Sequence, residues 1–163
     1  MSDELFLAWA AGFFDGEGCV LISEKCNGTV YQLFVSVTQQ DPAALYLFKQ
    51  RFGGNVTPDK TATKGYERKR GDVLCWRWKT TSITAHSFLA AIEPYVVCKA
   101  EQVRIALTWP TPGVQYQGRK MPEEVRLGRR KIMHDLRRVR AASKVYLASM
   151  HGYTTDVRQV SNG

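Results

Sequence analysis

Two carboxylates separated by glycines, Asp15-Gly16-Glu17-Gly18, are the residues whose types and spacing most clearly suggest chemistry. They end a helical pattern over residues 4–15, for which Ser2 or Asp3 is the expected N-cap. The glycines allow the chain to turn sharply there. A carboxylate at a helix C-terminus meets the partial negative charge of the last carbonyl groups, so a cation is expected to offset it. A hard divalent ion fits this chemistry; the alternative is an acidic helix end followed by a strand.

The same helix carries small residues on one face. Ala8, Ala11 and Gly12 are spaced by three and four positions, which places them on one side of a helix. Small side chains permit a second helix to approach closely. The stretch therefore predicts a helix that contacts another helix.

Residues 11–18, AGFFDGEG, resemble the LAGLIDADG motif of homing endonucleases. In that family the motif helices of two domains pack together, and each helix delivers its last acidic residue to a metal over the DNA. The resemblance implies that Glu17 binds the metal with the backbone carbonyl of Gly16, although Trp9-Ala10 stands where the family usually starts with leucine. Because the chain has one copy of the motif, the resemblance also implies a two-fold homodimer. The expected interface residues are Ala8, Ala11, Gly12 and Asp15, and Asp15 is expected mainly to cap or hydrogen-bond at the helix junction.

Two distant segments extend the resemblance. Residues 35–39, VSVTQ, end where the family often carries a polar active-site residue, which implies that role for Gln39. The segment 94–102 resembles one in which a proline is followed by a lysine near the scissile phosphate, which implies that Lys99 stabilises negative charge. Some relatives carry arginine at the position of Ala43, so either Lys25 or Arg77 replaces it or catalysis is weaker.

The resemblance implies metal-assisted phosphodiester hydrolysis. Mg²⁺ is the expected ion; Mn²⁺ is expected to substitute, and Ca²⁺ to bind without supporting cleavage. Gln39 is expected to position water. His86, His134 and His151 are isolated in the sequence and suggest no ligand set.

The composition favours a polyanionic partner inside a cell. The formal net charge is +8, and lysine and arginine neutralise phosphates. No run of about 18 apolar residues suggests a membrane span, and the acidic start of the chain is unlike a signal peptide. The cysteines at 19, 26, 75 and 98 fit no paired zinc pattern, which favours ordinary thiols in a reducing compartment.

The patterns along the chain predict an α+β fold with an αββαββα core and additional C-terminal helices. We expect one domain over 1–163, with a core over about 4–110, a helical extension over about 111–150 and a tail over 151–163. The expected helices cover 4–15, a stretch from Asp41-Pro42 to Phe52, 83–92, 97–109 and 123–150. The expected strands cover 19–25, 29–39, 55–59 and 73–80, with a hairpin turn at Asn27-Gly28.

Strand parity predicts which sheet face meets the partner. Tyr31, Leu33, Val35 and Val37 fall on one face, expected to be the core, together with Trp76 and Trp78. The opposite face is polar and basic, as suits a saddle in the major groove of duplex DNA, although a solvated edge hairpin is the alternative. The candidate DNA contacts are Ser23, Lys25, Gln32, Ser36, Arg77 and Lys79, with Lys64, Arg68 and Arg70 in the basic segment 60–70.

The sequence thus predicts a homodimeric endonuclease that cuts both strands of a long, roughly palindromic DNA site across the minor groove. One alternative is a binding protein of the same fold, either an RNA-binding intron maturase or a DNA-binding regulator. Another is a basic ribosome-type RNA-binding protein, in which the acidic helix end has no chemical role.

Overall fold

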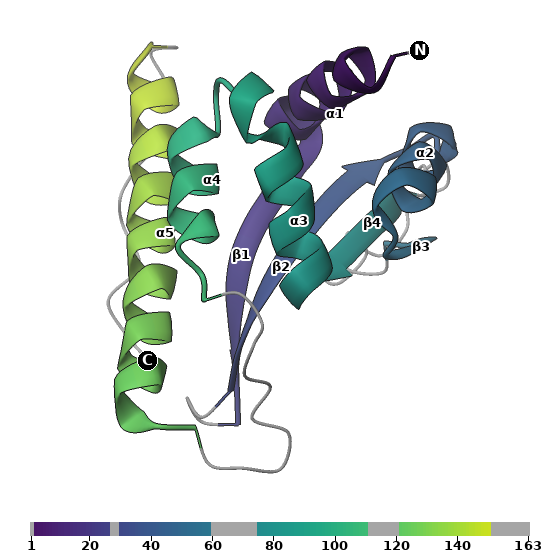
Figure 1. The fold of residues 1–163 in the computed structure, drawn as a ribbon. Helices are drawn as coiled ribbons and strands as arrows, with labels where there is room; N and C mark the ends of the chain where they lie inside the picture. The colour runs from purple at the N-terminus through teal and green to yellow at the C-terminus, as the bar shows by residue number, and fades with distance from the viewer. Residues whose placement is uncertain (1, 27–29, 60–74, 111–120, 151–163) are drawn as a thin grey trace, which may run out of the picture.

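A computed structural model of the chain describes residues 2–26, 30–59, 75–110 and 121–150, with side chains up to 143 (Figure 1). The chain is α+β, as predicted. Its elements in chain order are α1 Asp3–Glu17, β1 Gly18–Lys25, β2 Val30–Gln39, α2 Ala43–Phe52, β3 Asn55–Pro58, β4 Trp76–Thr81, α3 Ser82–Ile92, the 3-10 helix η2 Glu93–Tyr95, α4 Ala100–Leu107 and α5 Glu123–Met150.

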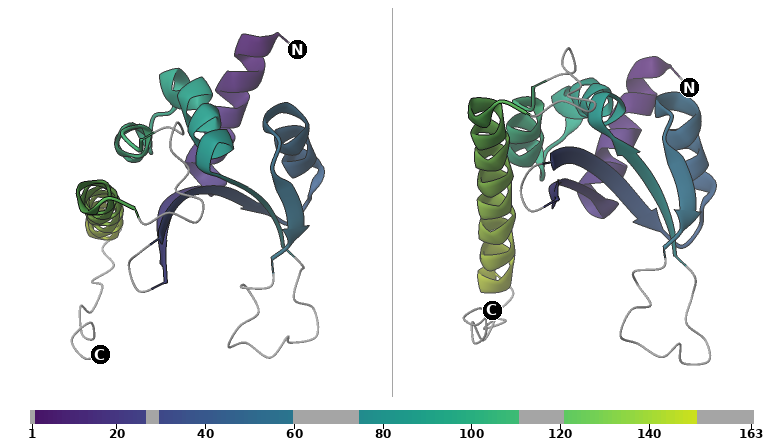
Figure 2. Two further views of the ribbon diagram at one scale, coloured as in Figure 1. Left: turned by 60° about the horizontal axis from the view of Figure 1, so that its bottom comes forward. Right: turned by 90° about the horizontal axis from the view of Figure 1, so that it is seen from below.

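The four strands form one antiparallel sheet in the order β1-β2-β4-β3. The sheet arches, and the helices lie on one side of it (Figure 2). The side chains of alternate residues point to opposite sides of a strand. We call the side away from the helices the outer face. Its residues are Cys19, Leu21, Ser23, Lys25, Val30, Gln32, Phe34, Ser36, Thr38, Asn55, Thr57, Arg77, Lys79 and Thr81.

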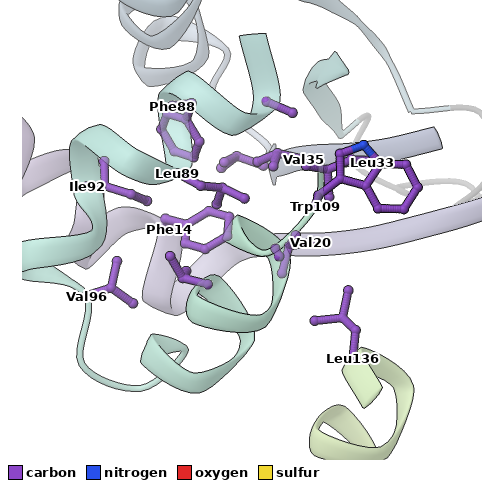
Figure 3. Packing of buried hydrophobic residues seen from close by; sticks show 14 of the residues in the cluster. Phe14, Val20, Leu33, Val35, Phe88, Leu89, Ile92, Val96, Trp109 and Leu136 are labelled. Carbon is purple, nitrogen blue, oxygen red and sulfur yellow. The ribbon is translucent and has the colours of Figure 1, made fainter. Parts of the chain in front are cut away.

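The core lies between the sheet and the helices. Phe14 of α1, Val20 of β1, Leu33 of β2 and Phe88 of α3 point toward one another there (Figure 3). The predicted core face of residues 31, 33, 35 and 37 is buried, because its side chains meet these helices. Trp78 is also fully buried, whereas Trp76, near the sheet's end, is only half-buried.

Trp78 illustrates how the core aromatic residues are fixed. Its ring centroid lies 5.1 Å from that of Phe48 and 5.1 Å from that of Phe88. Its indole N–H donates to the carbonyl of Gly53 over 2.8 Å, so the polar edge of the ring is satisfied while the rest is buried.

Several boundaries differ from the sequence prediction. The first helix continues through Glu17, because Gly16 is exposed and does not interrupt it. The helix predicted at 97–109 begins only at Ala100, and the backbone amides of residues 97–99 before it donate to the carboxylate of Asp15. The turn at 27–29, the basic segment with Lys64, Arg68 and Arg70, and the tail lie outside the described residues.

Helix α5 joins the core by part of its length. It lies beside α4 and along the β1–β2 side of the sheet (Figure 2). Met133 and Leu136 of α5 are buried in the core cluster. None of the helices that the structure describes has the length and apolar character needed to cross a membrane.

Candidate active site

The junction between α1 and β1 has no linker. Glu17 is the last residue of α1, and Gly18 is the first residue of β1. A Cβ atom on Gly18 would lie 2.1 Å from the ring of Phe14 and 2.4 Å from the Phe14 carbonyl oxygen. Phe14 is itself fully buried and cannot move aside. Glycine at position 18 therefore allows β1 to begin directly after the last residue of α1. This direct connection fixes the backbone position of Glu17, whose side chain is exposed.

Strand pairing brings Gln39 to the same end of the sheet as Glu17. Gly18, the first residue of β1, lies opposite Val37 in β2. Glu17 comes directly before β1 and Gln39 is the last residue of β2, so both residues lie at the same end of this strand pair. Gln39 is half-buried, and its Oε1 accepts a hydrogen bond from the amide of Gln40 over 2.8 Å. Two predicted site residues far apart in the sequence therefore share one sheet end.

Asp15 ties α1 to the segment before α4. Its carboxylate accepts hydrogen bonds from the backbone amides of Val97 over 2.7 Å, Cys98 over 3.1 Å and Lys99 over 2.9 Å. Such amides at the start of a helix carry partial positive charge and favour a carboxylate. This explains why an acidic residue is tolerated near the C-terminus of α1.

Lys99 completes this contact from the other side. Its ammonium group donates to the backbone carbonyl of Asp15 and lies 6.0 Å from the centre of the Phe14 ring. A cation at the C-terminal end of a helix is favourable. The structure thus brings Lys99 to the acidic end of α1, two residues from Glu17.

The exposed face of α1 is small and apolar. Ala8 and Gly12 are exposed, and Leu5 is 63% exposed. Ala11, predicted at the interface with a second copy, instead lies fully buried in the core of its own chain. One residue along a helix rotates the side chain by about 100°, which separates Ala11 from Gly12.

The predicted cations of the outer face differ in their surroundings. Lys25 and Lys79 are exposed, and their ammonium groups lie 5.9 Å and 4.1 Å from the centre of the Phe34 ring. Arg77 instead forms an ion pair with Asp59 over 2.6 Å, and its Nε donates to Thr38 over 3.4 Å.

The remaining candidates of the outer face are half-buried. The amide nitrogen of Gln32 donates to the hydroxyl of Ser82 over 3.5 Å, and Ser36 lies opposite Lys79. The Ser23 hydroxyl is buried without a hydrogen-bond partner. Strand parity also places Phe34 on this face, but Phe34 is not among the predicted contacts, although the ammonium groups of Lys25 and Lys79 both lie near its ring.

The chain offers few metal ligands by itself. Among the described residues, no three side chains of His, Cys, Asp or Glu form a group that could hold a metal ion. The oxygen donors at the end of α1 are the Glu17 carboxylate and the neighbouring backbone carbonyls. Within one chain, this is a partial donor set.

Solved structures share this fold. The chain is similar to the homing endonuclease I-CvuI in complex with the I-CreI target DNA, with a TM-score of 0.50 and 24% identity over 65% of this chain and 66% of that one. It is also similar to the archaeal intron-encoded homing endonuclease I-Vdi141I complexed with DNA, with a TM-score of 0.49 and 17% identity over 64% of this chain and 66% of that one. In each case just under two thirds of both chains is matched. No protein-family model matches the chain, and no curated protein matches it significantly. The matched architecture, with α1 leading directly into an arched antiparallel sheet, shows that this chain has the fold of the LAGLIDADG homing endonucleases.

Proposed function

We propose that the chain is a metal-dependent, sequence-specific endonuclease that cuts both strands of duplex DNA as a homodimer. The observations that support this proposal are that Glu17 and Gln39 lie at one end of the sheet and that Lys99 contacts the carbonyl of Asp15, two residues before Glu17. In the hydrolysis of a phosphodiester, a carboxylate can bind a metal, an amide can position a water and an ammonium group can stabilise the developing negative charge.

The outer face supports DNA as the substrate. It is an arched antiparallel surface that carries Lys25, Lys79 and Arg77, in a chain with a net charge of +8. A β-surface of this kind can enter the major groove, where cations contact phosphates and guanine edges. I-CvuI, which shares the fold, has been solved in complex with DNA.

The exposed face of α1 supports a homodimer. A Cβ atom on Gly12 or Gly16 would meet no atom within 4 Å, so nothing within the chain requires glycine there. Glycine inside a helix costs about 1 kcal/mol relative to alanine. Close packing against α1 of a second copy explains this cost. The apolar side chains of Leu5 and Val97, which are 63% and 79% exposed, flank the same surface.

The donors at the end of α1 fit Mg²⁺ in such a dimer. Mg²⁺ is bound by oxygen, often by one or two carboxylates together with substrate phosphates and water. Glu17 and the carbonyl of Gly16 would provide oxygen ligands, and the two-fold axis of the proposed dimer would bring a second Glu17 close. When bound, the metal would polarise a phosphate oxygen and lower the pKa of a bound water. Mn²⁺ would serve in its place, while Ca²⁺ would bind without supporting cleavage.

The chain's other residues act around the scissile phosphate. Gln39 orients the attacking water through its side-chain amide. The positive charge of Lys99 stabilises the negative charge that develops on the phosphate during the reaction. The hydrogen bond from Lys99 to the Asp15 carbonyl positions the ammonium group for this role. One such set in each subunit cuts one strand, so the two cuts lie across the minor groove of a roughly palindromic site.

The test is incubation of the purified protein with a randomised duplex DNA library, followed by sequencing of cut ends. Parallel reactions contain Mg²⁺, Mn²⁺ or Ca²⁺. Glu17→Gln removes the proposed metal ligand, and Glu4→Gln removes an exposed carboxylate at the other end of the same helix as a matched control.

We expect double-strand cuts at one pseudo-symmetric site with Mg²⁺ for the wild type and Glu4→Gln. We expect Glu17→Gln to lose at least about a thousandfold in rate while still binding the site. Specific retention of DNA without cutting would overturn the enzyme and favour a DNA-binding regulator. Preference for structured RNA would favour a maturase instead.

A further inference from the structure

Asp59 and Arg77 form an ion pair at the outer face. The Arg77 Nη2 atom lies 2.6 Å from a carboxylate oxygen of Asp59, whose side chain is only 5% exposed. The backbone amide of Asp59 in turn donates to the carbonyl of Cys75 over 2.8 Å, which fixes the carboxylate to the start of β4. A carboxylate on a surface that binds DNA repels the phosphates unless it pairs with a cation.

The sheet register places this pair at the active-site end. Arg77 lies opposite Thr38 on β2, and Thr38 follows Val37, the partner of Gly18. Arg77 therefore lies two strands from β1, at the end of the sheet where α1 leads into β1, with its guanidinium between Thr38 and Asp59. Neighbouring strands lie about 4.8 Å apart, so two strand spacings, about 10 Å, separate the backbone of Arg77 from that of β1.

Lys25, the other candidate to replace the missing cation at Ala43, is too far away. It lies opposite Val30 at the other end of β1, seven residues from Gly18. At about 3.4 Å per residue this is about 24 Å along the strand. Lys25 therefore cannot reach a phosphate held at Glu17.

We propose that Arg77 supplies the cation beside the scissile phosphate that Ala43 does not, and that Asp59 is a positioning residue for it. This inference rests on the proposed endonuclease function. The Asp59 carboxylate and the Thr38 hydroxyl hold the guanidinium in one orientation, while its 34% exposed side chain remains accessible to DNA. A preorganised cation stabilises the charge that develops on the phosphate oxygens without having to reorient during the reaction.

The experiment measures kcat and KM for cutting of the duplex selected by the wild-type protein. The variants are Arg77→Gln, Asp59→Asn and the double variant, with thermal unfolding followed in parallel. The matched control is Asp3→Asn with Arg51→Gln, which removes an exposed ion pair of 2.7 Å between α1 and α2 on the helical side of the sheet.

We expect kcat to fall about a hundredfold for Arg77→Gln and about tenfold for Asp59→Asn, with KM changed less than threefold. The double variant should be no slower than Arg77→Gln, because Asp59 acts only through Arg77. The control should stay within about twofold of the wild type. If Asp59→Asn does not fold, Thr38→Val removes the second contact of the guanidinium, and a selective fall in kcat is again expected.

Two results would overturn the role of the pair if the wild type cuts DNA. One is a double variant whose fall in kcat equals the product of the two single effects; the other is a set of variants in which KM changes and kcat does not. A wild-type protein that does not cut would overturn the proposed function, and this inference with it.

Discussion

The two ends of the outer face are held very differently. At the end next to α1, Arg77 is paired with Asp59 over 2.6 Å, and at the adjoining helix junction the carboxylate of Asp15 accepts hydrogen bonds from three backbone amides. At the far end, Lys25 lies 5.9 Å from the Phe34 ring centre, and Gln32 reaches Ser82 over 3.5 Å. These far-end contacts are long and confine the side chains little.

The difference matches two tasks on one surface. Hydrolysis loses much of its rate when a group is misplaced by about 1 Å, so the groups around the phosphate must be held in advance. Groove contacts tolerate adjustment, because bound water and DNA deformation accommodate it. In the proposed enzyme, changes near α1 should therefore affect cutting, and changes at the far end should affect binding.

Gly18→Ala should break the fixed end most severely. The new methyl group would overlap the Phe14 ring and carbonyl oxygen, both within 2.5 Å. We expect a loss of about 3 kcal/mol in stability, or about 10 °C in Tm, together with loss of cutting. Gly128→Ala is the control, since nothing lies within 4 Å of that position. Equal melting temperatures for the two variants would refute this account of the junction.

Gly12→Leu should remove the second copy while leaving each chain folded. The side chain meets nothing within its own chain, but it would keep two α1 helices apart. We expect a monomer in analytical ultracentrifugation, an unchanged circular dichroism spectrum and no double-strand cuts. Gly128→Leu, which also adds leucine to an open helical position, should remain dimeric. A dimeric Gly12→Leu protein would contradict the α1 interface.

Asp15→Asn should loosen the fixed end by an intermediate amount. Asparagine retains one acceptor and turns a donor toward backbone amides, so we expect a loss of about 1–3 kcal/mol. Asp41→Asn affects a single 2.9 Å bond to the amide of Ala43 and should cost less than about 1 kcal/mol. Chemical denaturation measures both. The comparison fails if the two variants lose equal stability.

Lys25→Gln should change the far end with a smaller effect. We expect weaker DNA binding and a slope of log K against log salt concentration that is less steep by about 1. Arg51→Gln removes a cation on the helical side and should leave the slope unchanged. Titrations at several salt concentrations measure the slope. An unaltered slope for Lys25→Gln would remove Lys25 from the interface.

The smallest effect should come from a charge away from the outer face. A hydrogen bond from Lys131 holds the pKa of Asp135 below its usual value of 3.8. A carboxyl group with a lowered pKa in the folded state stabilises the protein above its unfolded pKa, and this contribution is lost as the pH falls through the folded value. A slight Tm difference between wild type and Asp135→Asn should therefore be present at pH 7 and shrink as the pH falls below 3.8 and through the lowered folded-state pKa. A difference that does not shrink would contradict this origin.

The elements could be predicted because their signals are local. Alternation over residues 31–37 indicates a half-buried strand, and the glycines at 53 and 54 end the helix before them. The candidate site residues could be named from the motif resemblance alone. The structure places Glu17 and Gln39 at one end of the sheet and Lys99 beside Asp15, and the roles of these residues stay predictions.

The remaining features depend on tertiary contacts. Asp59 meets Arg77 only through the pairing of β3 with β4, and no local pattern marks that contact. The burial of Ala11 beside the exposed Gly12 depends on how α1 is rotated against the core. The hydrogen bond between the Val97 amide and Asp15 joins residues 82 positions apart in the sequence.

The absence of a linker between Glu17 and Gly18 also bears on how a DNA site is measured. In the proposed dimer, the angle and distance between the two α1 helices therefore determine the relative positions of the two sheets, because no flexible segment separates each helix from its sheet. The spacing of the two recognition surfaces then becomes a fixed length, set by one helix contact. Half-sites moved closer or farther by a single base pair should be rejected even when every base is otherwise correct.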